Sequence, residues 1–305
     1  MARIVLFGQA PFGARVLEGL LAAGHEVTRV CVPPDREGRP VDPLKEMALA
    51  SKLQVVQRKS YKPDEAYDEV APADADLGVL AFVTQIIPVR ILDAPRLASV
   101  CFHPSLLPAY RGGSALAWQL INGETRGGVT LFRPDDGVDA GPIYLQREVE
   151  IGADESAGSL YYKKIFEPGV EATLESVELV LSDSARGEVQ DESLATHDPL
   201  CRDEHAGVDW QRPAAELHNL IRGCDPAPGA HTTHNGETVR LYGSRRSSAS
   251  DAAEPGTVTA IDETGVEVAT GDGALRLQKL AAGGKKAPAA EAAEVAGIAV
   301  GARFV

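Results

Sequence analysis

The sequence is short of cysteine, and its few cysteines are not arranged for metal binding or cross-linking. Its 305 residues contain four, Cys31, Cys101, Cys201 and Cys224. None of them pairs with another in the Cys-x-x-Cys spacing that is typical of zinc sites, and their scatter does not form a disulfide framework. We therefore expect no bound metal and no disulfide, and reduced thiols favour a cytoplasmic protein.

The sequence also lacks any apolar stretch long enough to cross a membrane. The apolar runs around Val16 and Val79 break within about ten residues, whereas a spanning helix needs about 20. The chain begins Met1-Ala2-Arg3 and enters an apolar run at once. A signal peptide needs a longer apolar core and a small-residue cleavage site, so we expect neither a signal peptide nor a membrane partner.

Basic residues are outnumbered by acidic ones. The 30 Lys and Arg residues face 44 Asp and Glu residues, which gives a formal net charge of −14. Adjacent basic pairs such as Lys163-Lys164, Arg245-Arg246 and Lys285-Lys286 are short and far apart in the sequence. A protein that binds DNA or RNA needs clustered basic side chains to displace phosphate counterions, so the charge disfavours nucleic acid as a substrate.

The composition that remains is that of an ordinary globular protein. The chain is 44% hydrophobic and 24% charged, and 305 residues are enough for two domains. Residues 183–207 are polar, rich in Asp and Glu and poor in apolar anchors, so they are interpreted as a linker. We place the boundary inside this stretch, with one domain at 1–203 and a second at 204–305.

The first domain has the pattern of an α/β fold. An apolar strand at 2–8 is followed by a turn, a helix with apolar residues at helical spacing, and a second strand at 26–32. This βαβ start predicts a Rossmann-like domain with a parallel sheet. Further strands are expected at 77–82, 99–102, 128–132 and 143–149. A helical pattern extends from Ala157 to about Leu181, with a predicted break or kink at Pro168-Gly169.

The second domain has a different pattern. Short segments of alternating polarity occur between turns, at residues 238–242, 256–261, 265–270 and 274–280. Several short strands at such regular spacing favour a small, closed antiparallel architecture. We therefore predict a C-terminal β-barrel domain that is OB-like.

One histidine stands where an α/β sheet usually binds its ligand. His103 ends a predicted strand, and ligands bind beyond the carboxyl ends of strands in open α/β sheets. Residues 104–108, Pro-Ser-Leu-Leu-Pro, form an apolar loop stiffened by two prolines, which suits the packing of a flat ring against it. A histidine at the end of a strand can equally be a structural group, so its position alone leaves both interpretations open.

A second loop carries candidate carboxylates for this histidine. It contains Asp135, Asp136 and Asp139, with Gly137 and Gly141 to let the chain turn inward. Any of the three aspartates can be a solvated turn residue, and the residues alone do not choose among them.

The two loops together resemble the formyltransferase family, whose members take a formyl group from 10-formyltetrahydrofolate. The similar residues are His103 to Pro108 with Tyr110-Arg111-Gly112, and Asp136 to Ile143. The resemblance covers the whole chain, because Ile221-Arg222-Gly223 is similar to the start of the family's C-terminal barrel. Within the family the chain is most similar to the N-terminal hydrolase domain of 10-formyltetrahydrofolate dehydrogenase, and more distantly to methionyl-tRNA formyltransferase. No carrier or aldehyde-dehydrogenase domain is expected after Val305.

The resemblance implies a folate-binding catalytic domain at 1–203 with 10-formyltetrahydrofolate as co-substrate. It makes His103 the general acid or base and a hydrogen-bond donor to the formyl oxygen, with Asp139 orienting the imidazole. It also implies a folate pocket formed by the backbone at Gln85, Ile86 and Ile87 and by Ser105, Leu106, Leu107, Pro108, Asp136 and Val138.

Cys101 departs from the pattern of most of the family, which has Asn two residues before the histidine. The Asn amide donates to the developing oxyanion, and losing one such donor typically costs about 2.7–4 kcal/mol. Three interpretations of Cys101 are open: a small apolar residue as in the hydrolase-type domain, a weak oxyanion contact, or a thiolate nucleophile. A thiol is a poor donor, and His103 is the one basic neighbour that would lower its pKa.

The resemblance leaves several functions open. The leading hypothesis is a folate-dependent enzyme that hydrolyses 10-formyltetrahydrofolate or transfers its formyl group, with water or an amine as the acceptor. An N-formyltransferase acting on an amino sugar or another small amine is the main alternative. Methionyl-tRNA is disfavoured by the charge and by Ala109, where the family often has a basic residue. A folate-binding protein without catalytic activity is a further alternative, and the sequence does not indicate an oligomeric state.

Overall fold

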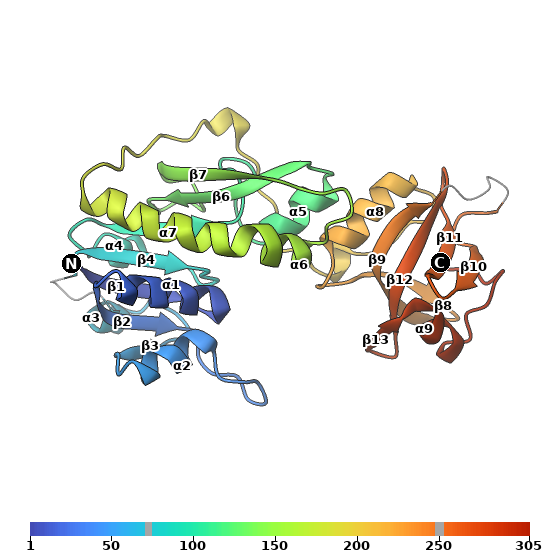
Figure 1. Cartoon of the computed structure of the whole chain (residues 1–305), viewed down its shortest axis with the longest axis horizontal. Helices are drawn as coiled ribbons and strands as arrows, with labels where there is room; N and C mark the ends of the chain where they lie inside the picture. Colours follow the sequence, from blue (N-terminus) through green and yellow to red (C-terminus); the bar gives the residue numbers. More distant parts are fainter. Residues whose placement is uncertain (71–74, 248–252) are drawn as a thin grey trace. The chain divides into compact units, whose positions relative to one another are not determined.

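A computed structural model describes residues 1–70, 75–247 and 253–305 (Figure 1). The chain folds into two compact units that alternate along the sequence. The first unit contains residues 1–112, 127–149 and 164–197, and the second contains 113–126, 150–163 and 198–305. Among the described residues, no helix is both long and apolar enough to span a membrane.

The first unit is built on a seven-stranded sheet with the strand order β3-β2-β1-β4-β5-β6-β7. Strands β1 to β5 pair in parallel, whereas β6 is antiparallel to β5 and places Thr130 opposite His103. The Rossmann-like α/β fold is therefore confirmed, with a mixed sheet in place of a purely parallel one. The strands are β1 (Arg3–Gly8), β2 (Glu26–Val32), β3 (Val55–Gln57), β4 (Leu77–Ala81), β5 (Ser99–His103), β6 (Arg126–Phe132) and β7 (Ile143–Glu150).

Helices cover both faces of this sheet, because successive residues of a strand point to opposite sides. Val5 and Phe7 of β1 join a buried cluster with the apolar residues of α3 and α4. On the opposite face α1 and α7 lie side by side (Figure 1), and the Phe12 ring of α1 packs 4.3 Å from that of Phe102. The helices are α1 (Ala10–Ala22), α2 (Pro43–Ala50), α3 (Asp64–Val70), α4 (Val89–Leu92) and α7 (Phe166–Leu181).

The helix does not break at Pro168-Gly169, but an irregular turn lies directly before these residues. A short α6 (Ala157–Leu160) and a π-helical turn (Tyr161–Ile165) precede α7. These three segments are contiguous, so Pro168 lies just after the π-helical turn, where the regular hydrogen bonding of the helix is already interrupted. A Cβ atom on Gly169 would lie 2.6 Å from Cε2 of Phe102, so this glycine allows α7 to approach β5 closely.

The second unit contains an antiparallel sheet with the strand order β10-β11-β12-β9-β8, to which β13 adds on β12. Residues 301–305 bond to both edges of this sheet: the pairs are Gly301–Val258, Ala302–Val258 and Phe304–Gly256 on one edge, and Val305–Thr233 on the other. The sheet is thereby closed, which confirms the predicted barrel. The strands are β8 (Ala230–His234), β9 (Glu237–Ser247), β10 (Val258–Asp262), β11 (Gly265–Ala269), β12 (Ala274–Ala282) and β13 (Lys285–Pro288).

Aromatic and aliphatic side chains fill the barrel of the second unit. Trp210 stacks on Phe304 at 5.8 Å between ring centroids, and its indole N–H donates to the Thr232 hydroxyl at 3.0 Å. The buried indole N–H therefore has a partner, as a buried polar group requires. The helices of this unit, besides α6, are α5 (Ala115–Ile121), α8 (Ala214–Gly223) and α9 (Ala289–Val295).

Candidate active site

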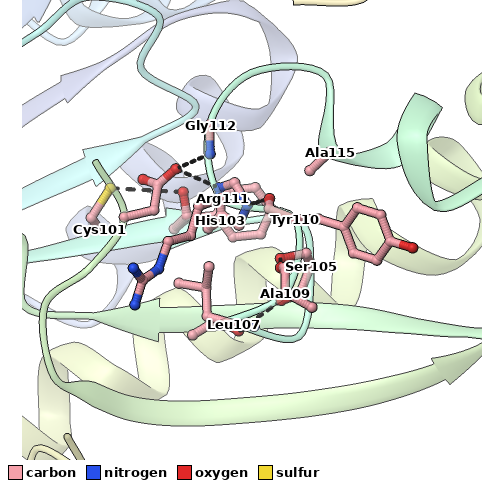
Figure 2. Close-up of polar contacts among 12 residues, drawn as sticks. Cys101, His103, Ser105, Leu107, Ala109, Tyr110, Arg111, Gly112 and Ala115 are labelled. Atoms are coloured by element: carbon pink, nitrogen blue, oxygen red, sulfur yellow. Dashed lines mark hydrogen bonds and ion pairs between the residues drawn. The ribbon is translucent and has the colours of Figure 1, made fainter. Parts of the chain in front are cut away.

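The end of β5 carries a buried histidine with a fixed proton position (Figure 2). Nε2 of His103 lies 2.8 Å from the backbone carbonyl oxygen of Tyr110. Because a carbonyl oxygen can only accept a hydrogen bond, Nε2 must carry a proton. In the neutral ring Nδ1 is then the unprotonated nitrogen, so this hydrogen bond selects the tautomer that leaves Nδ1 able to accept a proton.

Of the three candidate aspartates, Asp139 is the one that the structure brings to His103. Its Oδ2 lies 3.4 Å from Nδ1 of the ring and accepts a hydrogen bond of 2.8 Å from the Gly112 amide. Asp135 instead accepts from the amide of Gly137 within its own loop, and Asp136 is exposed. The backbone of Asp139 has φ +52°, a strained conformation that typically costs about 1–3 kcal/mol and is common at functional sites.

Nδ1 of His103 and Oδ2 of Asp139 form a pair of facing acceptors. With the ring neutral, neither atom offers a proton to the other across 3.4 Å. A group with two protons, such as water or an amine, satisfies both acceptors at once. When the ring is protonated, the same geometry gives an imidazolium beside a carboxylate, which stabilises the positive charge. The pair is therefore arranged to take up a proton from a molecule bound beside it.

Cys101 lies on the same face of β5 as His103, because every second residue of a strand points to the same side. Its side chain is half-buried against the apolar cluster beneath β5. Burial raises the pKa of the Cys101 thiol well above its ordinary value, and the Asp139 carboxylate raises the pKa further. Only the thiolate is a good nucleophile, so the environment of Cys101 argues against covalent catalysis by this residue.

The loop after His103 is fixed by hydrogen bonds from neighbouring strands. The Thr130 hydroxyl donates to the carbonyl of Ser105 at 2.7 Å and accepts from the amide of Leu107 at 3.1 Å. The Gln146 amide donates to the Leu107 carbonyl at 2.9 Å, and the Ser105 hydroxyl donates to the Ala109 carbonyl at 2.7 Å. The side chains of Ser105 and Leu107 are buried, so they shape the loop from within.

Leu106 and Pro108 are the members of this predicted folate loop that keep partial exposure. Both side chains are apolar, and both lie on a loop that the strands hold rigid. A preformed apolar surface of this kind suits a flat aromatic ligand, because little conformational entropy is lost on binding.

In the predicted folate segment, residues 85–87, the outer two residues hold the segment in place and the middle one is exposed. Gln85 donates through its side chain to the carbonyls of Arg58 and Lys59, and Ile87 is buried in the apolar cluster. Ile86 lies between them with its side chain 73% exposed. Within the described ranges, the backbone amides of Ile86 and Ile87 have no hydrogen-bond partner. These amides suit the backbone contacts that the sequence predicts.

The acidic loop presents its other two predicted ligand residues to solvent. Asp136 is exposed, and the apolar side chain of Val138 is 57% exposed next to Asp139. An exposed valine beside a partly exposed catalytic candidate is available for contact with a bound ligand. Within the described part of the chain, no three His, Cys, Asp or Glu side chains gather as metal ligands would.

Residues 188–197 reach this site, although the sequence predicts a linker there. The Tyr110 amide donates to the Thr196 hydroxyl at 2.7 Å, and the Arg111 amide donates to the Thr196 carbonyl at 2.9 Å. The Thr196 amide in turn donates to the Pro108 carbonyl at 3.3 Å. The linker prediction is therefore wrong for this segment, because it is hydrogen-bonded to the loop that follows His103. Its polar residues follow neither a helical nor a strand periodicity, so the sequence does not predict that this segment contacts the site loops.

Arg111 is buried and also bonds to this segment. Its guanidinium donates to the Gln190 side-chain oxygen at 3.1 and 2.8 Å and to the Glu192 carboxylate at 3.0 and 2.7 Å. The sequence leaves open whether Arg111 contacts substrate or neutralises an acidic segment. These contacts assign it the second role.

The fold and these residues match one known family along both units. Residues 2–177 match the formyl transferase family, and residues 201–295 match the formyl transferase C-terminal domain. The chain belongs to the formyl transferase family.

Relatives of two kinds are similar in sequence. A mitochondrial 10-formyltetrahydrofolate dehydrogenase of Mus musculus is 40% identical over 79% of this chain, which corresponds to 27% of the mouse protein. A methionyl-tRNA formyltransferase of Solibacter usitatus is 37% identical over 95% of this chain and 94% of its own length. The chain thus spans about a quarter of the dehydrogenase and nearly all of the tRNA enzyme.

Solved structures with lower identity share the fold. HypX from Aquifex aeolicus in complex with tetrahydrofolic acid superimposes with a TM-score of 0.67 at 23% identity, over 97% of this chain and 47% of its own. WlaRD, a sugar 3N-formyl transferase, superimposes with a TM-score of 0.70 at 19% identity, over 93% and 99% of the two chains.

Proposed function

We propose that this protein hydrolyses 10-formyltetrahydrofolate to tetrahydrofolate and formate, with His103 and Asp139 as its catalytic pair. The observation that carries the proposal is the pair of facing acceptors, Nδ1 of His103 and Oδ2 of Asp139, 3.4 Å apart. Water, with its two protons, satisfies both. Membership of the formyl transferase family and 40% identity to the mouse dehydrogenase support the folate co-substrate.

In the proposed reaction the water oxygen attacks the formyl carbon and gives a proton to Nδ1 of His103. The carboxylate of Asp139 stabilises the imidazolium, and the Tyr110 carbonyl holds the opposite N–H group. The tetrahedral intermediate then collapses: the bond from carbon to N10 of the folate breaks, and the proton on Nδ1 passes to N10. Tetrahydrofolate and formic acid leave, the acid loses the second water proton to solvent to give formate, and the ring returns to its starting tautomer.

Cys101 supports water as the acceptor. The raised pKa of its thiol keeps the sulfur protonated, and this weak S–H donor points to the Phe102 carbonyl at 3.8 Å, so Cys101 does not replace the amide donor to the oxyanion. A missing donor of this kind slows formyl transfer by about 10²–10³. Water is always present at the site, so a slow hydrolysis proceeds where a slow transfer to a scarce amine does not.

We further propose that folate lies against the exposed apolar side chains of Ile86 and Val138 and the partly exposed ones of Leu106 and Pro108. The amides of Ile86 and Ile87, which lack partners within the described ranges, are then available to the polar edge of the pterin. The loop of residues 105–109 is held by Thr130 from the sheet, which supports a preformed surface.

Formyl transfer to an amine is the second candidate function. It is favoured by the match of this chain to 94% of a methionyl-tRNA formyltransferase. A tRNA acceptor is disfavoured by the net charge of −14 and by the pairing of basic residues of the second unit with carboxylates, as in Arg240–Asp203, Arg245–Asp154, Arg276–Asp262 and Lys286–Asp225. Small amines, including amino sugars, are the acceptors that this charge favours.

The test is turnover of 10-formyltetrahydrofolate with and without acceptors. We expect tetrahydrofolate and formate to appear in buffer alone, and His103→Ala and Asp139→Asn to lower the rate by about 10²–10⁴. An absolute requirement for an amine, among amino sugars, amino acids and methionyl-tRNA, would overturn hydrolysis. Folate binding without turnover under any of these conditions would support a non-catalytic binding protein instead.

We also propose where this activity is located. Every residue proposed for chemistry or folate contact falls within 1–203, so residues 204–305 form an accessory barrel domain. The four cysteines are free thiols, two of them half-buried and therefore open to oxidation. Free thiols of this kind persist in a reducing compartment, which supports a cytoplasmic protein.

A further inference from the structure

One buried side chain outside the predicted site bonds to both loops that hold His103. The side chain of Gln190 is 6% exposed. Its Nε2 donates to the carbonyls of Asp139 at 2.9 Å and Gly141 at 2.7 Å. Its Oε1 accepts from Nε and Nη2 of Arg111 at 3.1 and 2.8 Å. The two donors and two acceptor positions of the amide are therefore all used.

The two loops joined by Gln190 supply the two partners of the imidazole. Arg111 directly follows Tyr110, whose carbonyl accepts from Nε2 of His103. Asp139 supplies the carboxylate at Nδ1. A direct bond also links the loops, because the Gly112 amide donates to the Asp139 carboxylate. The amide of Gln190 therefore sets the distance between the two groups that hold the ring.

The backbone of Asp139 needs such support. Its φ of +52° is strained for a residue with a side chain, and strain of this kind persists only where surrounding contacts enforce it. Gln190 donates one hydrogen bond to the carbonyl at the start of the turn, at residue 139, and one to the carbonyl at its end, at residue 141. Without them the turn is free to relax and to carry the carboxylate away from Nδ1.

We propose that Gln190 is a positioning residue for the formyl-group reaction, which fixes Asp139 against His103 and touches no substrate itself. This inference rests on the proposed function of that pair. It also explains why residues 188–197, which the sequence predicts as a linker, follow the site loops so closely.

The chemistry of the amide permits a selective test. In Gln190→Glu the carboxylate still accepts from Arg111 but faces the carbonyls of Asp139 and Gly141 without a donor. In Gln190→Met both sets of bonds are lost at similar volume. Glu192→Gln is the matched control on the other side, because it weakens a contact to Arg111 and leaves the Asp139 turn bonded.

A second glutamine gives a control with a different expected effect. Gln146 is exposed and donates to the Leu107 carbonyl and the Thr130 hydroxyl, so it holds the proposed folate loop. Gln146→Met should raise KM for the folate and leave the pH profile of kcat in place. The inference therefore predicts that the two glutamine variants change different kinetic parameters.

Steady-state kinetics of the full chain with 10-formyltetrahydrofolate measure these effects. For Gln190→Glu and Gln190→Met we expect kcat to fall about 10- to 100-fold, since misplacement of a catalytic group by about 1 Å costs up to 10². KM should change by less than about threefold, and the pH profile of kcat should move. Glu192→Gln should keep kcat and its pH profile.

The outcomes separate this inference from the proposed function. Unchanged kcat and pH profile in folded Gln190 variants, with turnover still lost in His103→Ala, would overturn the role of Gln190 alone. Full turnover in His103→Ala would overturn the proposed function. The ¹⁵N signals of the His103 ring give a readout without turnover: they should move in Gln190→Glu, and unchanged signals would also overturn the role. If either variant fails to fold, Gln190→Asn, which keeps both amide groups on a shorter chain, replaces it.

Discussion

Nε2 of His103 donates a hydrogen bond of 2.8 Å to the backbone carbonyl of Tyr110. The acceptor is a main-chain group, so side-chain substitution at position 110 does not remove it. It also directs the free nitrogen, Nδ1, toward Asp139 and away from the loop that follows the strand. The chemistry proposed for this site depends on that orientation, because one nitrogen holds the ring and the other exchanges a proton with the reacting molecule.

Replacing Cys101 with asparagine should raise transfer to amines. The new amide would donate to the oxyanion, and because one such donor is worth about 10²–10³ in rate, we expect a gain of at least about tenfold. Cys101→Ala is the matched control: it removes the thiol without adding a donor and should leave hydrolysis near the wild-type rate. The measurement is formyl transfer to a panel of amines alongside formate release. No gain in Cys101→Asn would show that acceptor geometry, and not the missing donor, limits transfer.

The four cysteines should react with iodoacetamide in a defined order. The hydrogen bond from Cys224 lowers the pKa of the half-exposed Cys201, whereas burial raises the pKa values of Cys31 and Cys101. Because the thiolate is the reactive form, a difference of one pKa unit gives about a tenfold difference in rate. At pH 8 we expect Cys201 to be alkylated first and Cys101 at least about tenfold more slowly, as followed by peptide mass spectrometry. In urea all four should react alike. Equal rates for Cys101 and Cys201 in the folded protein would instead support the interpretation of Cys101 as a thiolate nucleophile.

Replacing Gly169 with alanine should destabilise the first unit and impair turnover. The new Cβ would lie 2.6 Å from the Phe102 ring, next to His103, and overpacking of this kind costs about 1–3 kcal/mol. Gly19→Ala is the control in α1, because its Cβ would meet the tip of half-buried Leu174, which has room to move. We expect that change to be neutral or stabilising by up to about 1 kcal/mol, from helix propensity. Urea unfolding measures both, and equal stability of the two variants would contradict the packing argument.

Acid should remove a stabilising contribution of Asp262 in the second unit. Hydrogen bonds from Thr264, and then from Arg276, lower the pKa of this carboxyl from 3.8 to about 2. A carboxyl whose pKa is lower in the folded than in the unfolded state stabilises the fold above pH 3.8, and this contribution disappears as the pH falls to about 2. Asp262→Asn should therefore have a lower Tm than wild type at pH 7, with the difference shrinking below pH 4 and vanishing near pH 2. A constant difference across that range would show that the bonds do not depend on the charge.

Much of the fold is predictable from local patterns. The strand at Arg3–Gly8, the helix at Ala10–Ala22 and the strand at Glu26–Val32 follow from apolar spacing and a turn, because each buries one side of a regular element. The position of His103 at the end of β5 follows in the same way. The alternating segments of the second unit predict the barrel strands. The sequence does not predict that residues 301–305 close the barrel, because they do so by bonding to two sheet edges that are far apart in the sequence.

The helical region after residue 157 shows where local rules mislead. Pro168-Gly169 looks like a break because both residues are poor in helix interiors. In the structure the helix continues through both residues: Pro168 directly follows a π-helical turn, and Gly169 makes room for Phe102. The need for a small residue there comes from a partner in β5, far away in the sequence.

The sequence by itself determined the α/β and barrel architecture, the family and the histidine at the end of its strand, since these depend on local periodicity and on motifs of contiguous residues. The tertiary structure decided which aspartate meets that histidine, which ring nitrogen is free, and that Gln190 holds the two loops in place. Those choices depend on hydrogen bonds between groups that lie up to 79 residues apart, as between Arg111 and Gln190. No local pattern encodes such contacts, because they form only when the sheet has brought the loops together.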